Sequence, residues 1–247
     1  MIYIKKEGVT DELNQQIITI RKSEEWKKIP ESNTEAIRKV FDTDFPKNEI
    51  KKILVHEQKG ICAYCMRRIY SDSHSRIEHW TPLSKNKEKA IDYNNMLGVC
   101  DGGERVSSQQ VHILCCDANK KEIEITTSPL NKIQMDKIAY RSDGTIYTDP
   151  MDKEMERDIN EVLMLNGIQK SDGSVRDTST EILKGRRDAY DRAKIMMKTL
   201  DKKDKCSSAQ VQKLIDALLA KEEYEEYLGV KLYYFKKKYA SLLKRGL

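Results

Sequence analysis

The chain has 247 residues, of which 38% are hydrophobic and 34% are charged. This length is sufficient to bury a core without disulfide bridges, which excludes a mini-protein. The net charge of +5 is too small to identify a polyanionic partner by itself. No apolar run approaches the length of a membrane span and the start of the chain is charged, so a soluble, cytoplasmic protein is expected.

The first part of the chain, residues 1–55, is expected to form an N-terminal helical segment. Residues 2–4 alternate like a short strand. Thr10 then has the position of an N-cap, and the apolar spacing that follows predicts one helix that continues through Trp26. Pro46 is placed to open a further helix.

In the middle of the chain, residues 56–125, helical periodicity disappears and Cys, His, Pro, Gly and Asn occupy the informative positions. We expect this segment to carry the chemistry. The remainder, residues 126–247, is expected to form a small hairpin around Asp143-Gly144 and then a helical region, in which Gly229 is a candidate break. The predicted class is therefore α+β and mostly helical.

The last seventeen residues, 231–247, form a basic and aromatic tail without acidic residues. The spacing favours an amphipathic last helix with a solvated lysine face and an aromatic core face. Docking on phosphates or on an acidic partner is the alternative use of this tail.

Six cysteines in a protein that is expected to be cytoplasmic indicate metal binding rather than a disulfide framework, because that compartment keeps thiols reduced. Cys62-Ala-Tyr-Cys65 is a C-x2-C knuckle, which points two thiolates at one tetrahedral ion such as Zn²⁺. Cys100 and one member of the pair Cys115-Cys116 can complete the site, provided that the loop 101–114 leaves it and returns. His112 is a weaker candidate for the fourth ligand.

The segment between the cysteines resembles the motifs of the HNH endonucleases. Glu78-His79 followed by Pro82 resembles the first motif, and Asn95, five residues before Cys100, resembles the second. The segment CDANK, residues 116–120, resembles the closing C-[HN]-x-x-K motif. In that family a β-hairpin packs on a helix to form a ββα-metal element, which a structural zinc stabilises when cysteines are present. The resemblance implies Cys62, Cys65, Cys100 and Cys116 as zinc ligands.

Phosphodiester cleavage accounts for the remaining residue types. A divalent cation, Mg²⁺ or Mn²⁺, requires oxygen ligands, and Glu78 can supply one. His79 suits the general base because an imidazole titrates near neutral pH. The resemblance implies that Asn95 supports the loop that bears His79. The usual final His of the third motif is replaced by Asp117, with Asn119 as a competing oxygen donor, so the second ligand stays open between them.

A second resemblance covers nearly the whole chain. It is to the HNH nuclease subunits of the bacterial Septu antiphage system (PtuB) and to related retron-associated HNH proteins. The matching segments are MIYIKKEG (1–8), EQKGICAYCMRRI (57–69), RIEH (76–79), DYNN (92–95), SPL (128–130), DGTI (143–146) and LMLN (163–166). This resemblance implies a nuclease subunit that acts with an ABC/SMC-like ATPase of the PtuA type on nucleic acid, with DNA favoured over RNA. A stand-alone HNH restriction or mobile-element endonuclease, and a zinc-stabilised nucleic-acid-binding module without activity, are the alternatives.

Overall fold

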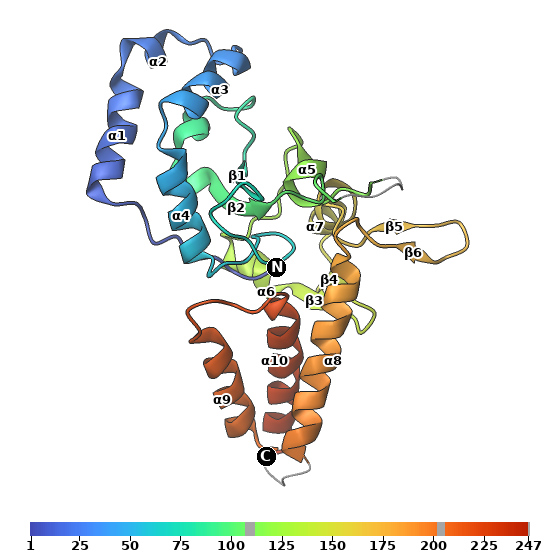
Figure 1. The fold of residues 1–247 in the computed structure, drawn as a ribbon. Helices are drawn as coiled ribbons and strands as arrows, with labels where there is room; N and C mark the ends of the chain where they lie inside the picture. Colours follow the sequence, from blue (N-terminus) through green and yellow to red (C-terminus); the bar gives the residue numbers. More distant parts are fainter. Residues whose placement is uncertain (107–111, 202–205, 247) are drawn as a thin grey trace.

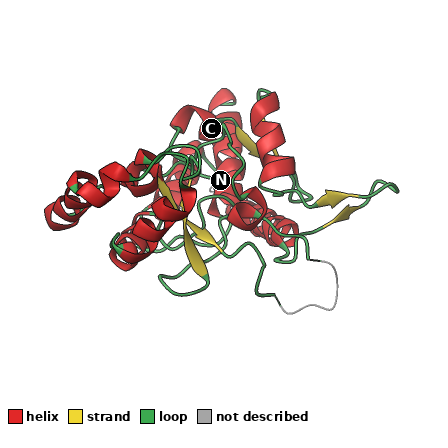
Figure 2. Cartoon of the chain, turned by 90° about the horizontal axis from the view of Figure 1, so that it is seen from above, coloured by secondary structure: helices red, strands yellow, loops and turns green. Residues whose placement is uncertain are grey.

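The computed structural model describes residues 1–106, 112–201 and 206–246. The expected α+β class is confirmed, since helices predominate and the strands of the described residues form small two-stranded antiparallel sheets (Figures 1 and 2). None of the helices in these ranges combines the length and apolar character that crossing a membrane requires.

Four helices form the N-terminal part: α1 (Asp11–Lys22), α2 (Glu24–Lys28), α3 (Thr34–Thr43) and α4 (Lys47–Glu57). Thr10 caps α1 as predicted, because its hydroxyl accepts a hydrogen bond from Leu13 N. The prediction of one helix through Trp26 was wrong. Ser23 adopts an extended conformation and its hydroxyl accepts from Trp26 N, so it starts the separate helix α2.

The predicted strand at residues 2–4 was also wrong. This segment belongs to no sheet, and a single backbone hydrogen bond runs from Ile4 N to Pro129 O. Met1 and Ile4 are nevertheless buried, so the apolar spacing reflects packing on the core and not strand pairing.

The middle of the molecule contains the antiparallel pair β1 (Ser75–His79) and β2 (Met96–Cys100), in which Glu78 lies opposite Leu97. The connection between them carries two short 3₁₀ turns, η1 (Glu88–Ile91) and η2 (Tyr93–Asn95). The N-terminal helices cover this connection, because Trp26, Ile37, Phe41 and Ile50 share one apolar cluster with Ala90, Ile91 and Met96. The short helix α5 (Cys116–Lys120) follows β2 in the chain and packs on it.

The next region contains small elements. They are α6 (Lys132–Asp136), β3 (Ile138–Tyr140), β4 (Ile146–Thr148), α7 (Lys153–Arg157), the π-helical turn η3 (Asp158–Val162), β5 (Ile168–Gln169) and β6 (Val175–Arg176). The hairpin predicted around Asp143-Gly144 is present as the pair of β3 and β4. The β5–β6 hairpin projects from the body of the molecule in both ribbon views.

Three helices, α8 (Ile182–Asp201), α9 (Ser208–Leu219) and α10 (Leu228–Lys244), form a C-terminal bundle with its own apolar cluster. The predicted break at Gly229 was misplaced, because the helix is interrupted at 220–227 and Gly229 lies inside α10. Glycine is needed there for close packing: a Cβ atom would lie 2.8 Å from Met66 Sδ and 3.0 Å from Met1 O.

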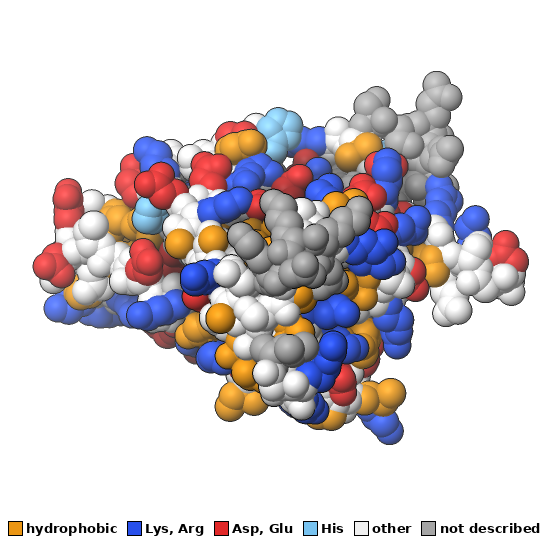
Figure 3. Space-filling view, turned by 90° about the horizontal axis from the view of Figure 1, so that it is seen from below, with side chains coloured by type: hydrophobic (Ala, Val, Ile, Leu, Met, Phe, Trp, Pro, Cys, Tyr) orange, Lys and Arg blue, Asp and Glu red, His pale blue; other side chains and the backbone are white. Residues whose placement is uncertain are grey.

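The amphipathic character predicted for the tail is confirmed in α10, except that Lys231 does not belong to a solvated lysine face, because it is buried and pairs with Glu225. Phe235 is fully buried, and Tyr233 packs edge-on against Tyr140 at 5.9 Å between ring centroids. The three consecutive lysines 236–238 are exposed. In the view from below, Lys and Arg side chains lie on several parts of the surface among acidic and apolar ones, without a single dominant basic face (Figure 3).

Candidate metal centre and active site

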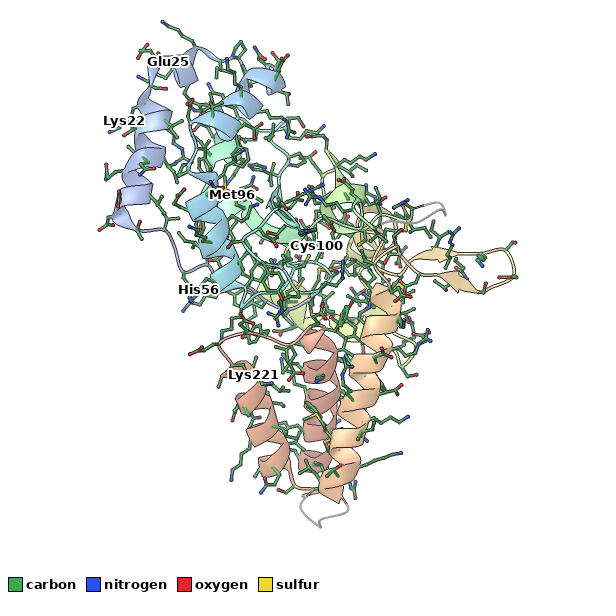
Figure 4. The ribbon with its side chains drawn as sticks, viewed as in Figure 1. Lys22, Glu25, His56, Met96, Cys100 and Lys221 are labelled. Carbon is green, nitrogen blue, oxygen red and sulfur yellow. The ribbon has the colours of Figure 1, made fainter. Side chains whose placement is uncertain are left out.

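Four cysteines come together near the middle of the molecule, where Figure 4 labels Cys100. The Sγ atoms of Cys62, Cys65, Cys100 and Cys116 all lie within 4.8 Å of one another, and all four residues are buried. The Sγ atoms of Cys62 and Cys116 are 3.9 Å apart, and those of Cys65 and Cys100 are 3.6 Å apart. A tetrahedral zinc with bonds of about 2.3 Å sets its sulfur ligands about 3.8 Å apart, whereas a disulfide bond is about 2.05 Å long. The cluster therefore fits one metal ion such as zinc.

The turn that carries Cys62 and Cys65 is held by the backbone and by one buried amide. Met66 N donates to Cys62 O at 3.0 Å, which closes the turn. The side chain of Gln58 ties the end of α4 to β2, because its Nε2 donates to Gly98 O and its Oε1 accepts from Gly98 N, each at 2.7 Å. These bonds place the knuckle beside the strand that ends in the third cysteine.

The structure brings Cys116 into the cluster and places Cys115 beside it. Cys115 Sγ lies 3.6 Å from Gly102 O and 3.6 Å from Thr180 Oγ1. Gly102 has a φ of +64°, and a Cβ atom there would lie 2.2 Å from Cys115 O, so glycine permits this close approach. Part of the predicted loop that leaves the site and returns, residues 107–111, lies outside the described residues.

The other histidines stay apart from the cluster. His112, the alternative ligand, is exposed, and its Nδ1 lies 3.4 Å from Gly103 O. His74 is exposed in the turn before β1, and His56 is exposed near the C-terminal end of α4 (Figure 4).

Positively charged groups lie near the four thiols. Arg186 is 1% exposed and forms no ion pair with any acidic side chain that the structure describes, although buried charges are normally paired. Burial lowers the pKa of Arg186, and Tyr140, Asp177 and Cys65 oppose that shift in decreasing order. Burial also disfavours the charge of Arg67, but Cys65 and Cys100 raise its pKa above the ordinary value. A metal site with four thiolate ligands is negatively charged, and these guanidinium groups would balance that charge.

Beside the cluster, at the end of β1, lies a cleft of about 420 Å³. Glu78, His79 and Asp117 line this cleft together. The predicted acid-histidine pair and the acid from the closing motif therefore share one solvent-accessible space.

Glu78 is 3% exposed, and two hydrogen-bond donors contact its carboxyl group. Tyr64 Oη donates to Glu78 Oε1 at 3.1 Å, and Lys120 Nζ lies 2.8 Å from the same oxygen. Burial raises the pKa of Glu78 well above its usual value and the carboxyl group of Asp117 raises it further, whereas the Lys120 ammonium lowers it. Glu78 and Asp117 thus form a pair of oxygen donors of the type that Mg²⁺ and Mn²⁺ prefer, with Lys120 in contact with one oxygen.

Of the two residues considered for the second oxygen ligand, the structure brings only Asp117 to the cleft. Asp117 Oδ2 lies 3.5 Å from Arg76 Nη1. The side chain of Asn119 does not line the cleft, and its Nδ2 donates to Glu161 O at 3.1 Å and to Val162 O at 3.0 Å. Asn119 therefore holds the end of η3 in place.

His79 is oriented by its contacts on both sides. Its Nε2 lies 3.0 Å from Ala90 O, and the ring packs edge-on against Phe41 at 4.6 Å between centroids. Burial lowers the pKa of His79 to about 4, so the ring is neutral at pH 7. A neutral ring that bonds to a carbonyl through Nε2 carries its proton there, which leaves Nδ1 as the basic nitrogen.

Asn95 connects the two ends of the β1–β2 connection. Its Oδ1 accepts from Thr81 N at 2.8 Å, and its Nδ2 donates to Thr81 O at 2.9 Å and to Lys89 O at 3.0 Å. Asn95 is 3% exposed and does not line the cleft. These bonds fix the chain that directly follows His79, which is the supporting position that the motif implied.

Tyr64 and Lys120, the two residues that contact Glu78, have no role predicted from the sequence. Lys120 is fully buried and also donates to His79 O at 3.2 Å. A signal for both existed in the sequence, because Tyr64 lies inside the C-x2-C knuckle and Lys120 is the lysine of the closing motif. Neither position by itself reveals which side chain it contacts.

The chain matches none of the protein-family models against which it was scanned, and it matches no curated protein.

Proposed function

We propose that this chain is a metal-dependent endonuclease of the HNH type that hydrolyses phosphodiester bonds in nucleic acid, with DNA favoured over RNA. The observation that carries the proposal is the meeting of Glu78, His79 and Asp117 in one cleft beside a four-cysteine cluster. The order β1, β2, α5 and the packing of α5 on β2 agree with a ββα-metal element.

The proposed chemistry assigns one task to each group. Glu78 and Asp117 would hold a divalent cation, Mg²⁺ or Mn²⁺, which when bound neutralises charge on the phosphate and stabilises the leaving oxygen. His79 Nδ1 accepts the proton of the attacking water, while Ala90 O keeps the ring in place. The cysteines hold a structural zinc that fixes β2 and α5, and that zinc takes no part in the reaction.

Cleavage of plasmid DNA and of RNA, with Mg²⁺ or Mn²⁺ added, tests this proposal. We expect His79→Ala to lower the rate by at least about 100-fold because the base is removed. The matched control is His74→Ala, which changes an exposed histidine outside the cleft and should cleave normally. Normal cleavage by an uncontaminated His79→Ala protein, or no cleavage by the unaltered chain with and without its ATPase partner, would contradict the proposal.

We further propose that the chain is the nuclease subunit of an antiphage complex with an ABC/SMC-like ATPase. The resemblance to the Septu and retron-associated proteins supports this, and so does a C-terminal bundle with its own core. If α10 contacts the ATPase, changing lysines 236–238 to glutamate should abolish co-purification of the two proteins. Glutamates at Lys194, Lys198 and Lys213, which are exposed on α8 and α9, are the control for the change in net charge.

A second candidate is a zinc-stabilised nucleic-acid-binding module without activity. The contact of Lys120 Nζ with Glu78 favours it, because an ammonium group at this carboxylate competes with a cation. Mn²⁺ binding, measured by electron paramagnetic resonance, separates the two functions. The nuclease requires a bound Mn²⁺ that is lost in Asp117→Ala, whereas the binding module requires none.

A further inference from the structure

The cleft has a wall that lies outside the HNH-like motifs. Helix α3 contributes Arg38, and helix α4 contributes Lys47 and Lys51. Arg76 on β1 and Lys121 after α5 line the cleft from the other side. Five cationic side chains therefore share the cleft with three acidic ones, which are Glu78, Asp117 and Glu122.

Two of these cations form no ion pair with an acidic side chain in the described part of the chain. Lys51 Nζ donates to two backbone carbonyls, Asp72 O and Ser75 O, each at 3.0 Å. Lys121 is exposed, and like Lys51 it forms no ion pair with the acidic groups of the described chain. Both side chains thus carry positive charge beside the candidate active site, and no described carboxylate lies within ion-pair distance of either one.

The other two cations of the N-terminal wall take part only in weak ion pairs. Arg38 Nη2 lies 3.2 Å from Glu122 Oε1, and the two side chains are 53% and 50% exposed. Lys47 Nζ lies 2.8 Å from Asp42 Oδ1, again with partly exposed side chains. Exposed pairs of this kind contribute about 0–1 kcal/mol, so a phosphate group can replace the carboxylate at small cost.

We infer that Arg38, Lys47 and Lys51 form a phosphate-binding wall that holds the nucleic-acid backbone on either side of the bond presented to His79. This inference rests on the proposed nuclease function and adds a substrate-binding role for α3 and α4. A polyanion bound to this wall lies against Glu78 and His79, because the same cleft contains all of them. The acidic surface of a partner protein is disfavoured, since it would fill the space that a substrate needs.

Binding of a fluorescent DNA duplex of about 20 base pairs to the His79→Ala protein tests the inference without cleavage. In that background, glutamines at Arg38, Lys47 and Lys51 should raise Kd by about 10- to 100-fold near 0.1 M salt, and should reduce the slope of log K against log salt by about 2 to 3. The control places glutamines at Lys194, Lys198 and Lys213, which removes the same charge from the C-terminal bundle and should change neither quantity.

Two single variants keep the test decisive if the triple variant fails to fold. Lys47→Gln changes an exposed pair and should reduce the salt slope by about 1. Glu122→Gln should act in the opposite direction and tighten DNA binding by about 2- to 5-fold, because it frees Arg38 for phosphate. A purely structural role of the Arg38–Glu122 pair would not tighten binding.

The outcomes separate the inference from the proposed function. If the unaltered chain cleaves DNA and the wall variants bind like the control, only the inference is overturned. If the wall variants lose DNA binding but the unaltered chain cleaves nothing, the nuclease proposal fails and the phosphate-binding wall stands. Absence of DNA binding by the His79→Ala protein, or loss of ATPase co-purification with intact DNA binding in the wall variants, overturns the inference.

Discussion

The cysteine cluster and the candidate active-site cleft both take residues from α5 but differ in the groups that contact their ionisable side chains. Four thiols converge in the cluster at the distances that one tetrahedral metal ion sets. In the cleft, Glu78 already contacts Lys120 and Tyr64. The comparison teaches that the cleft is preorganised by the protein's own side chains, whereas the cluster is arranged to fit a metal ion.

The two sites are nevertheless connected through the chain. Tyr64 lies between two cysteines of the cluster, and Lys120 lies one helical turn after Cys116. Both contact Glu78, so the elements that a bound metal would hold are also the elements that position the carboxyl group. Loss of the metal should therefore disorder the cleft, whereas damage to the cleft should leave the metal bound.

The largest expected effect comes from the cluster. Cys116→Ser should abolish zinc binding. The protein should then lose its cooperative unfolding transition, because structural zinc contributes about 10 kcal/mol or more to folding in comparable sites. Cys115→Ser is the matched control, since Cys115 lies beside the cluster and not in it, and should retain about one zinc per chain. Elemental analysis and thermal unfolding give the answer, and the reverse ranking of the two variants would show that Cys115 is the ligand.

A smaller effect is expected from breaking the ion pair of the cleft. At a pH at which Glu78 stays ionised, Lys120→Met leaves its buried carboxylate without a cation and should cost about 3–5 kcal/mol of unfolding free energy, with the zinc retained. The loss should become smaller as the pH falls, because burial raises the pKa of Glu78 and the carboxyl group then takes up a proton. Urea unfolding measures this loss. Adding Glu78→Gln to Lys120→Met should restore part of the stability, because no uncompensated charge is then buried.

Lys121→Met is the control, because it makes the same substitution at an exposed neighbouring lysine. Its unfolding free energy should stay within about 0.5 kcal/mol of that of the unaltered protein. Equal stability of the Lys120 and Lys121 variants would mean that the buried pair does not hold the cleft together.

The features that the sequence predicts well are local ones. The C-x2-C spacing follows from the geometry of a tight turn around one ion, and the four cysteines of the cluster are those that the motifs implied. Thr10 as an N-cap and the turn at Asp143-Gly144 were predicted for similar reasons, since cap and turn preferences act over a few residues.

The features that were missed depend on contacts between distant segments. The buried contact of Lys120 with Glu78 joins residues 42 positions apart, and no local pattern encodes it. Residues 2–4 look like a strand because their apolar side chains face the core, but no neighbouring strand is available to pair with them. Gly229 resembles a helix break in the sequence, but its missing side chain serves close packing against Met66.

A smaller effect is expected at Tyr64, which lies between two cysteines of the cluster and contacts Glu78 in the cleft. Tyr64→Phe removes one donor to Glu78 without altering the cysteines, and should cost about 2 kcal/mol, the usual range for a hydrogen bond to a charged group. The zinc content should not change. Tyr70→Phe, at a tyrosine that is 59% exposed, is the control and should be neutral. Loss of zinc in Tyr64→Phe would mean that the cleft also supports the cluster.

The smallest effect is expected at Asn119. Its side chain donates to two carbonyls at the end of η3, so Asn119→Ala should cost about 1 kcal/mol and leave cleavage within about 2-fold of normal. Asp117→Asn, which keeps the size of the side chain but removes its charge, should lower cleavage by at least about 100-fold because Asp117 faces Glu78 in the cleft. Parallel urea unfolding and cleavage assays compare the two variants. Cleavage that is lost in Asn119→Ala and retained in Asp117→Asn would assign the second oxygen ligand to Asn119, and would require α5 to turn before the cleft can bind its cation.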